Sequence, residues 1–284
     1  MGIDIAGWQK KIIDSLAARG ISVQPFSSGS FSLLSFEGKP QLVIHLINID
    51  NNFSADDLLM LENKCRSSAI QLIQLWEDIW LKRPEQVLGR ICSMLGINRK
   101  IHGRKTKAES ISQQQADEFL NQYHLQGSAK ARHKYGLLAE GKIVAVATFS
   151  AKRKMTRRQK AGYTSVELIR FATLDGFTVQ GGMSKLIGHM IEMVRPNDVM
   201  TYADLDWSYG KGYVKLGFHL DDQLPPSVIY LDCTSYSRYF LHRLPEEMIR
   251  ILSGLQEKER DTYLKSLHYN RIFNTGNLKY ILYL

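Results

Sequence analysis

Cysteine and long apolar segments are what this sequence has least of. It contains three cysteines in 284 residues, Cys65, Cys92 and Cys233, and they lie far apart. An odd, scattered set excludes a disulfide framework and a cysteine-based zinc site, and it is typical of a reducing compartment. No run of about 18 apolar residues occurs, so we predict no transmembrane helix and no membrane partner. The first residues carry Asp4 and no long apolar stretch, which indicates no secretory signal and favours a cytoplasmic location.

The rest of the composition is that of a folded protein with a basic surface. Hydrophobic residues make up 44% of the chain and aromatic residues 10%, which is enough for a core and excludes a disordered chain. The length allows one large domain or two modest ones. The formal net charge is +9. A positive balance favours polyanionic partners through counterion release, so charge alone leans towards a nucleic acid.

Helical and strand patterns alternate in the first third of the chain. Helical spacing of apolar residues predicts helices, and apolar runs bounded by turn residues predict strands. We predict a helix over 4–19, a hairpin over 31–50, a helix over 54–69, a strand over 70–76 and a helix over 83–96. Ser54, with Asp57 three residues on, is the expected N-cap of the second helix. Together these elements predict a compact α/β unit.

A basic segment follows this unit. Residues 97–110 read INRKIHGRKTKAES and contain five cations, Arg99, Lys100, Arg104, Lys105 and Lys107. Such a segment is either a solvated linker or a strip that lies along a phosphate backbone, and both interpretations stay open. We predict a basic linker over 99–110, which separates a domain at 1–98 from a second domain at 111–284.

The second domain has a distinctive order of predicted elements. A helix over 112–124 precedes two strands, 135–141 and 142–150, and a second basic segment, 151–165. A strand over 166–174 then leads through a loop to a helix that ends near Val194. A strand over 198–206, a short helix over 208–217 and a strand over 227–233 complete the order β-β-β-loop-helix-β-helix-β.

Two adjacent glycines, Gly181 and Gly182, stand at the start of the long helix and are followed by Ser184 and Lys185. A helix N-terminus has free N–H groups and the positive end of the helix dipole, and glycine lets a ligand approach the backbone. The pattern is therefore typical of phosphate binding. Two glycines also make a tight turn without any ligand, and these residues alone do not choose between the two interpretations.

The order of elements and this loop together resemble the GNAT acyltransferases. In that family a central strand ends in a pyrophosphate loop, Q/R-x-x-G-x-G/A. This chain has Val179 to Ser184, VQGGMS, in that register, without the initial Gln or Arg. YVKLGF, residues 213–218, resembles the Y-x-x-x-GF that ends many such domains. The resemblance implies an α/β (α+β) fold with a mixed sheet, and acetyl-CoA or a related acyl or aminoacyl donor. The implied cofactor-binding residues are Gln180, Gly181, Gly182, Met183, Ser184 and Lys185.

A longer resemblance, over roughly residues 70–284, is to phage-encoded Mom-like DNA-modification proteins. It rests on the segments HLQG, ELIRFA, VQGGMSKLIGHMI, TYADLDWSYGKGYVKLGF and YNRIFNTGNLKYIL. It implies a transferase that modifies the exocyclic amine of adenine in DNA, in the cytosol of a bacterial host. Mapped by motif, the implied catalytic residues are Arg170, Ser184, Asp204, Tyr213 and His124.

The chemistry of an adenine amine assigns roles to most of these residues. Its lone pair is delocalised into the ring, so attack on a donor needs a proton acceptor, and Asp204 is the best carboxylate for it. Tyr213 or Ser184 can protonate the leaving group or hold an oxyanion. Arg170 can bind a carboxylate or a phosphate with two hydrogen bonds.

Each residue also has a purely structural explanation, which stays open. Arg170 and Asp204 can pair across neighbouring strands. Ser184 can be a helix N-cap, and Tyr213 a core aromatic residue. His124 can complement the dipole at a helix C-terminus.

DNA contact is predicted at aromatic and basic residues. An extruded base needs aromatic surfaces, for which Trp207 and Tyr209 are candidates, although core packing also explains Trp207. The basic segment between the predicted strands, near the supposed site, suits contact with the DNA backbone, but it can equally be a solvated hairpin loop. The predicted DNA-binding residues are Lys152, Arg153, Lys154, Arg157, Arg158, Lys160, Arg104 and Lys105.

LENKCRSSAIQLIQLWEDIWLKRPEQVLGRICSMLG resembles the later part of Vsr-like nuclease domains of the PD-(D/E)xK type. Such domains hold a divalent metal with a carboxylate on a central strand. Here His45 and Asn48 stand where acidic and glycine residues are expected, and Asp50, Glu62 and Lys64 form no convincing set. We predict a degenerate nuclease fold without a metal site. The alternatives are a metal-dependent endonuclease targeted by the GNAT-like domain, a non-catalytic DNA-binding phage protein, and a protein-acetylating enzyme, which the basic surface disfavours.

Overall fold

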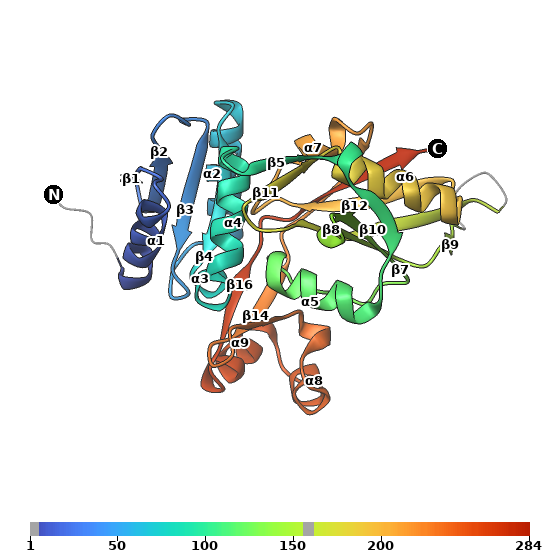
Figure 1. Cartoon of the computed structure of the whole chain (residues 1–284). Helices are drawn as coiled ribbons and strands as arrows, with labels where there is room; N and C mark the ends of the chain where they lie inside the picture. The colour runs from blue at the N-terminus through green and yellow to red at the C-terminus, as the bar shows by residue number, and fades with distance from the viewer. Residues whose placement is uncertain (1–5, 156–161) are drawn as a thin grey trace. The chain divides into compact units, whose positions relative to one another are not determined.

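The computed structural model describes residues 6–155 and 162–284 and divides into two compact units (Figure 1). Unit 1 comprises Met1–Pro84, Asp204–Tyr209 and Gln223–Asn277, and unit 2 comprises Glu85–Ala203, Gly210–Asp222 and Leu278–Leu284. The units therefore do not follow the predicted ranges 1–98 and 111–284. Both combine helices with sheets, so the predicted α/β class is confirmed. No helix in the described part of the chain has the length and apolar character needed to cross a bilayer.

The first sheet of unit 1 has the strand order β1-β2-β3-β4. Its elements are α1 (Gly7–Ala18), β1 (Val23–Ser28), β2 (Phe31–Phe36), β3 (Leu42–Ile47), α2 (Ala55–Ser67), β4 (Gln71–Trp76) and α3 (Glu77–Lys82). β1, β2 and β3 pair antiparallel, and β3 pairs with β4 in parallel. Every residue of β3 is buried, which explains its nearly continuous apolar sequence. Ser54 accepts a hydrogen bond from the Asp57 N–H, so the predicted N-cap of α2 is confirmed.

A second sheet of unit 1 comes from the late part of the chain. β14 (Val228–Asp232) pairs with β15 (Ser237–Tyr239) and β16 (Tyr269–Phe273). Between β15 and β16 the chain forms η2 (Leu241–Arg243), α8 (Glu246–Ser253) and α9 (Glu257–Ser266). The prediction that β14 is the last strand of the GNAT-like sheet is therefore wrong, because its apolar side chains pack in unit 1.

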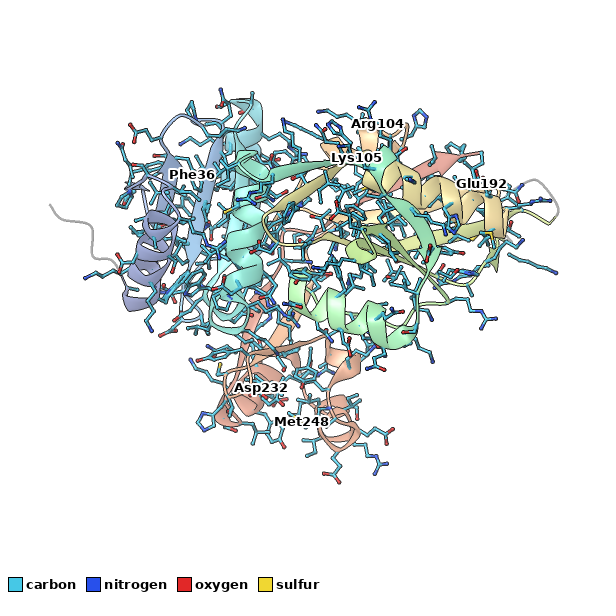
Figure 2. The ribbon with its side chains drawn as sticks, viewed as in Figure 1. Phe36, Arg104, Lys105, Glu192, Asp232 and Met248 are labelled. Atoms are coloured by element: carbon cyan, nitrogen blue, oxygen red, sulfur yellow. The ribbon has the colours of Figure 1, made fainter. Side chains whose placement is uncertain are left out.

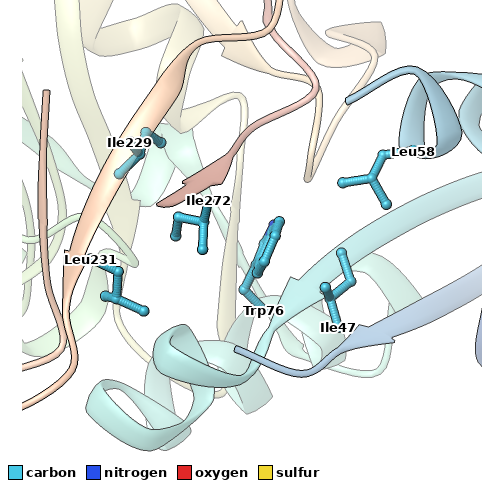
Figure 3. Packing of buried hydrophobic residues seen from close by; sticks show 6 residues of the cluster. All are labelled: Ile47, Leu58, Trp76, Ile229, Leu231 and Ile272. Carbon is cyan, nitrogen blue, oxygen red and sulfur yellow. The ribbon is translucent and has the colours of Figure 1, made fainter. Parts of the chain in front are cut away.

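One hydrophobic cluster joins the early and the late segments of unit 1 (Figure 3). Six buried side chains form it, three from β3, α2 and β4 and three from β14 and β16: Ile47, Leu58, Trp76, Ile229, Leu231 and Ile272. The α/β elements of the first 84 residues consequently share their core with β14 and β16, which belong to the segment Gln223–Asn277. Unit 1 has to fold around both.

Unit 2 is built on a mixed sheet with the strand order β13-β17-β12-β10-β8-β7-β6, and β9 pairs with β10. The strands are β6 (Lys107–Ser110), β7 (His133–Ala139), β8 (Lys142–Phe149), β9 (Arg153–Lys154), β10 (Thr164–Thr173), β12 (Asp198–Asp204), β13 (His219–Leu224) and β17 (Asn277–Tyr283). The helices include α4 (Pro84–Leu95), α5 (Gln113–Tyr123), α6 (Gly182–Val194) and α7 (Lys211–Val214). β7, β8 and β10 pair antiparallel, whereas β10 and β12 are parallel.

The predicted order of elements is confirmed from β7 to α7, apart from two short strands that were not predicted, β9 in the basic segment and β11 (Phe177–Gln180) in the loop before α6. It differs at the end, where β13 is the strand after α7 and β17 inserts between β12 and β13. All six residues of β13 are exposed, so its sequence, HLDDQL, has no apolar alternation that would reveal a strand.

The segment predicted to be a linker is part of unit 2. β5 (Arg99–His102) pairs in parallel with β11 (Phe177–Gln180), η1 (Gly103–Lys105) is a 3₁₀ turn, and β6 pairs with β7. The prediction of a linker over 99–110 is therefore wrong. The side chains of β5 are mostly exposed, so its sequence resembles a solvated linker, and its conformation depends on β11, far along the chain.

Candidate active site

The two parallel strands at the centre of unit 2 part after a short stretch of pairing. β10 and β12 pair only from Ser165 with Asp198 to Leu168 with Thr201. At the last pair the Thr201 hydroxyl donates to the Leu168 carbonyl at 3.0 Å. On its other side β10 changes register against β8 between Leu168 and Arg170. The second half of β10 is therefore released from β12, which leaves its backbone edge available to another partner.

The glycine loop, residues 179–184, leads from β11 into α6. Gly181 is the N-cap, with φ of 72°, and an added Cβ there would meet no atom within 4 Å. A Cβ on Gly182 would lie 2.9 Å from the Val179 side chain, so that position requires glycine. Val179 is 5% exposed, which explains an apolar residue where GNAT loops have Gln or Arg. The first turn of α6 carries no acidic residue. The positive end of the helix dipole and the free N–H groups there are therefore not offset by a carboxylate in this turn.

Ser184 lies in the first turn of α6 with an exposed side chain. Because Gly181 holds the N-cap position, the interpretation of Ser184 as the N-cap is wrong. Lys185, predicted to bind the cofactor, has its ammonium on backbone carbonyls. It donates to Gly103 O at 3.0 Å and to Thr106 O. Lys185 thus connects α6 to the turn η1.

Arg170 and His124 come from different motifs that meet in unit 2. Arg170 Nε donates to the Gly127 carbonyl at 3.3 Å, and its Nη1 donates to Ile169 O at 2.9 Å. His124 is the C-cap of α5, and its Nδ1 accepts the Gln126 N–H at 3.1 Å. Its ring proton is therefore on Nε2. Arg170 supports the turn that begins at His124.

Tyr213 lies in α7 among other aromatic residues. Its ring centroid is 5.6 Å from that of Phe218 and 5.8 Å from that of Tyr280. A Cβ on Gly210, the N-cap of α7, would lie 2.3 Å from the Tyr280 ring. Tyr280 is the residue of this group that sequence reasoning did not single out, because β17 is brought beside β12 only by the fold.

Asp204 ends β12 and begins a turn in unit 1. Its Oδ1 accepts the Asp206 N–H at 3.1 Å, and its carbonyl accepts the N–H groups of Trp207 and Ser208. Asp206 is 3% exposed and its Oδ1 accepts from the Thr275 hydroxyl at 2.6 Å and the Thr275 N–H at 2.8 Å. Burial and the Asp204 charge raise the pKa of Asp206 to about 7. Asp206 was missed by sequence reasoning, although the Asp-Leu-Asp spacing could have revealed it.

The two aromatic candidates for base stacking are held in unit 1. Trp207 is 8% exposed, so its core interpretation is the one that the structure supports. The Tyr209 hydroxyl accepts the Leu72 N–H at 3.3 Å, and the Arg66 guanidinium lies 5.7 Å from the centre of its ring. Both rings are therefore used in packing.

Those predicted DNA-binding residues that the structure describes lie at opposite ends of α6. The Lys152 ammonium donates to the carbonyl of Val194, the last residue of α6. The two residues of β9, Arg153 and Lys154, are both exposed. Val194 is about 20 Å along the helix from Gly182, because α6 has 13 residues. Lys152 therefore lies away from the glycine loop, whereas the sequence analysis predicted that the basic segment lies near the supposed site. Arg157, Arg158 and Lys160 fall outside the described residues.

Arg104 and Lys105 lie at the other end of α6. Both belong to η1, and both side chains are exposed. Figure 2 draws them over the beginning of α6, and the bond from Lys185 to Gly103 places their turn against it. These two cations therefore lie beside the glycine loop.

Strand β3 of unit 1 has a neutral imidazole where a metal-dependent nuclease would need a carboxylate. His45 is fully buried, its Nδ1 hydrogen-bonds Gln74 Oε1 at 2.7 Å, and Phe31 and Phe53 pack on its ring. Burial lowers the pKa of His45 to about 4, so the ring is uncharged at neutral pH. In the described part of the chain, no three His, Cys, Asp or Glu side chains gather as a metal site requires.

Comparison with known proteins identifies similarity only among solved structures. No family model matches the chain, and no curated protein matches it. A Bacillus subtilis acetyltransferase solved with CoA is 16% identical, with a TM-score of 0.33, over 63% of this chain and 99% of that one. A GNAT family acetyltransferase from Elizabethkingia anophelis with acetyl-CoA bound is 14% identical, with the same TM-score and coverage. An IAA acetyltransferase from Bacillus cereus is 12% identical, again with a TM-score of 0.33, 63% and 99% coverage. Function has to be argued from the residues of the site.

Proposed function

We propose that unit 2 is a GNAT-like acyltransferase domain that takes its acyl group from a coenzyme A thioester and transfers it to a base in DNA. One observation carries the proposal. The glycine loop and the parting of β10 from β12 follow one another within a single β10-β11-α6 segment of unit 2. A phosphate-binding helix end next to a strand edge that has parted from β12 suits a ligand with a pyrophosphate at one end and an amide-containing arm.

The residues of the loop fit the phosphates of coenzyme A. Gly181 leaves open space on its Cβ side, and the first turn of α6 has no carboxylate that would repel a phosphate. Arg104 and Lys105 add two exposed cations beside it. Bound there, the thioester would supply an acyl carbon that is activated towards an amine. Acetyl-CoA is the simplest such donor, and a related acyl or aminoacyl compound fits the same loop.

The acceptor that we propose is the exocyclic amine of adenine. Its proton needs an acceptor during attack, and Asp204, the last residue of the unit 2 strand β12, is the proposed one. The Tyr213 hydroxyl, or that of Ser184, is the proposed proton donor to the leaving thiolate. Arg170 would keep the turn after His124 in place, which follows from its bond to Gly127 O. The net charge of +9 supports DNA as the substrate.

The experiment that tests this function is nucleoside analysis. The protein is expressed in a bacterial host, the host DNA is digested to nucleosides, and mass spectrometry looks for a new deoxyadenosine species. We expect a mass increase that disappears in Asp204→Ala and persists in Asp56→Asn, an exposed carboxylate on α2. An unaltered deoxyadenosine profile with folded protein present would contradict the proposed substrate.

Cleavage of DNA by unit 1 is the alternative that the geometry supports less. A metal-dependent nuclease needs carboxylates on its central strand, whereas β3 presents His45, committed to Gln74. Binding of DNA without catalysis remains the interpretation to adopt if the nucleoside profile is unaltered. Tight, salt-dependent binding without affinity for coenzyme A would then support it.

A further inference from the structure

A strap of residues 99–106 lies on the strand that leads into the glycine loop. It consists of β5, η1 and Thr106, and β5 pairs with β11 over its whole length, from Arg99 with Phe177 to His102 with Gln180. The Arg99 N–H also donates to Gly176 O at 2.9 Å. The last residue before Gly181 is therefore tied to the strap by a parallel ladder.

Within the strap, the Gly103 carbonyl accepts three hydrogen bonds. Gly103 O accepts from the Thr106 N–H at 3.0 Å, from the Thr106 hydroxyl at 2.6 Å and from the Lys185 ammonium at 3.0 Å. Lys185 also donates to Thr106 O. Gly103 and Thr106 are both buried. Lys185 therefore uses two of its three N–H donors to hold the strap, and its side chain is half-buried, whereas Arg104 and Lys105 of η1 are exposed.

Strap and loop are in backbone contact at this point. A Cβ on Gly103 would lie 2.7 Å from Gln180 O and 3.4 Å from the Gly181 carbonyl carbon. No side chain fits between them, so any movement of the loop has to move the strap as well. A strap that is locked by Lys185 consequently restricts the loop.

We propose that Lys185 is a positioning residue for the glycine loop and does not itself bind the donor. It locks the strap against Gly181 and so fixes the N–H groups of residues 182–184 before a phosphate arrives, which lowers the entropy cost of binding. The inference rests on the proposed function of the loop as the donor site. It assigns direct phosphate contact to the exposed Arg104 and Lys105, and an indirect role to Lys185.

The test compares three substitutions in the full chain. Lys185→Met keeps the length of the side chain and removes its donors, and Lys185→Arg keeps donors. Lys142→Met removes an exposed lysine from the start of β8, outside the strap. Hydrogen exchange of the amides of residues 181–184 is measured without ligand. The Kd for coenzyme A is measured by calorimetry at several salt concentrations.

We expect Lys185→Met to accelerate exchange at residues 181–184 and to weaken coenzyme A binding, each about tenfold, which is about 1.4 kcal/mol. The salt dependence of the Kd should stay that of the wild type, because no cation that touches phosphate has been lost. Lys185→Arg should recover most of both effects, and Lys142→Met should match the wild type.

Two results would overturn the proposal. One is wild-type exchange in Lys185→Met, and the other is weaker binding accompanied by a reduced salt dependence, which marks a direct phosphate ligand. If the wild type binds no coenzyme A, the proposed donor is wrong, and the exchange comparison alone decides the role of Lys185. If Lys185→Met does not fold, Thr106→Val removes only one donor to Gly103 O, and it has to show faster exchange at the same amides.

Discussion

Arg238 holds Asp78 across 160 residues of sequence with two hydrogen bonds, Nε to Oδ2 at 2.7 Å and Nη2 to Oδ1 at 2.8 Å. The Asp78 side chain is 1% exposed and that of Arg238 is 23% exposed. The guanidinium also lies 5.9 Å from the centre of the Trp76 ring. Within unit 1 the pair therefore fastens β15 to the start of α3, beside the shared hydrophobic cluster.

Removing one partner of this pair should destabilise unit 1 strongly. Asp78→Ala leaves a largely buried guanidinium without its carboxylate, so we expect a loss of about 3 kcal/mol in the free energy of unfolding. Glu257→Ala is the control within unit 1, because it breaks an exposed ion pair with Arg271, and it should cost less than about 1 kcal/mol. Urea denaturation followed by tryptophan fluorescence measures both. Equal losses in the two variants would contradict a structural role for Arg238 and Asp78.

The hydrophobic cluster that the early and late segments of unit 1 share leads to a second prediction, which compares a buried and an exposed isoleucine. Ile272 of β16 is 1% exposed and packs with Trp76 and Ile47, whereas Ile251 of α8 is 49% exposed. Ile272→Ala should cost about 2–4 kcal/mol of unfolding free energy, and Ile251→Ala less than about 1 kcal/mol. The same denaturation experiment tests it. If Ile272→Ala is as mild as Ile251→Ala, the late segment does not contribute to the core of unit 1.

Glu62 makes the stability of unit 1 depend on pH. Burial raises the pKa of this carboxyl from 4.5 to about 7, against the opposing effects of Tyr209 and Arg66. The folded state therefore binds the proton more tightly than the unfolded chain, and its stability falls as pH rises between these two values and is level above them. We expect the wild type to lose about 3 kcal/mol relative to Glu62→Gln between pH 4.5 and pH 7.

Urea midpoints of the wild type and Glu62→Gln over this pH range check the prediction. His45 and Asp206, whose pKa values are also shifted, are present in both proteins, so their contributions cancel in the difference. A difference that does not change with pH would mean that Glu62 ionises normally in the folded protein.

Local sequence patterns were sufficient to predict the helices and strands that form from neighbouring residues. Helix α2 has its Ser54 cap and an apolar face within one segment, and α6 begins at a glycine pair that no helix interior would contain. The order from β7 to α7 follows from such segments. The position of the glycine loop at the start of α6 could therefore be predicted.

Long-range pairing decided the rest. β5 has the sequence of a solvated linker, because its partner β11 is far along the chain and its side chains point to solvent. β14 has an apolar sequence that suits any sheet, and only the cluster around Trp76 assigns it to unit 1. The role of Lys185 was missed for the same reason, since its acceptor Gly103 is 82 residues away.

The missing glutamine of the pyrophosphate motif leads to a fourth stability prediction. Restoring it with Val179→Gln places an amide in a buried position that packs on Gly182. We expect this variant to lose about 2 kcal/mol of unfolding free energy and to gain no affinity for coenzyme A. Gln180→Ala, at the neighbouring exposed position, is the control and should be near neutral. Tighter binding in a stable Val179→Gln protein would show that the loop adapts to the motif.

The cations at the two ends of α6 should separate donor binding from DNA binding. Arg153 and Lys154 lie on β9 near the C-terminal end of α6, whereas Arg104 and Lys105 lie on η1 beside its N-terminal end. Changing both members of the first pair to Gln should lower the slope of log K against log salt for DNA binding by an amount that corresponds to about two phosphate contacts. The Kd for coenzyme A should stay unchanged. The second pair should weaken coenzyme A binding about tenfold, because two charges beside the phosphates are lost. Each double variant is the control for the other. Calorimetry measures the Kd for coenzyme A, and fluorescence anisotropy at matched salt measures the Kd for DNA. If both doubles weaken both ligands equally, the basic surface is a single site, and the assignment of the glycine loop to the donor loses its support.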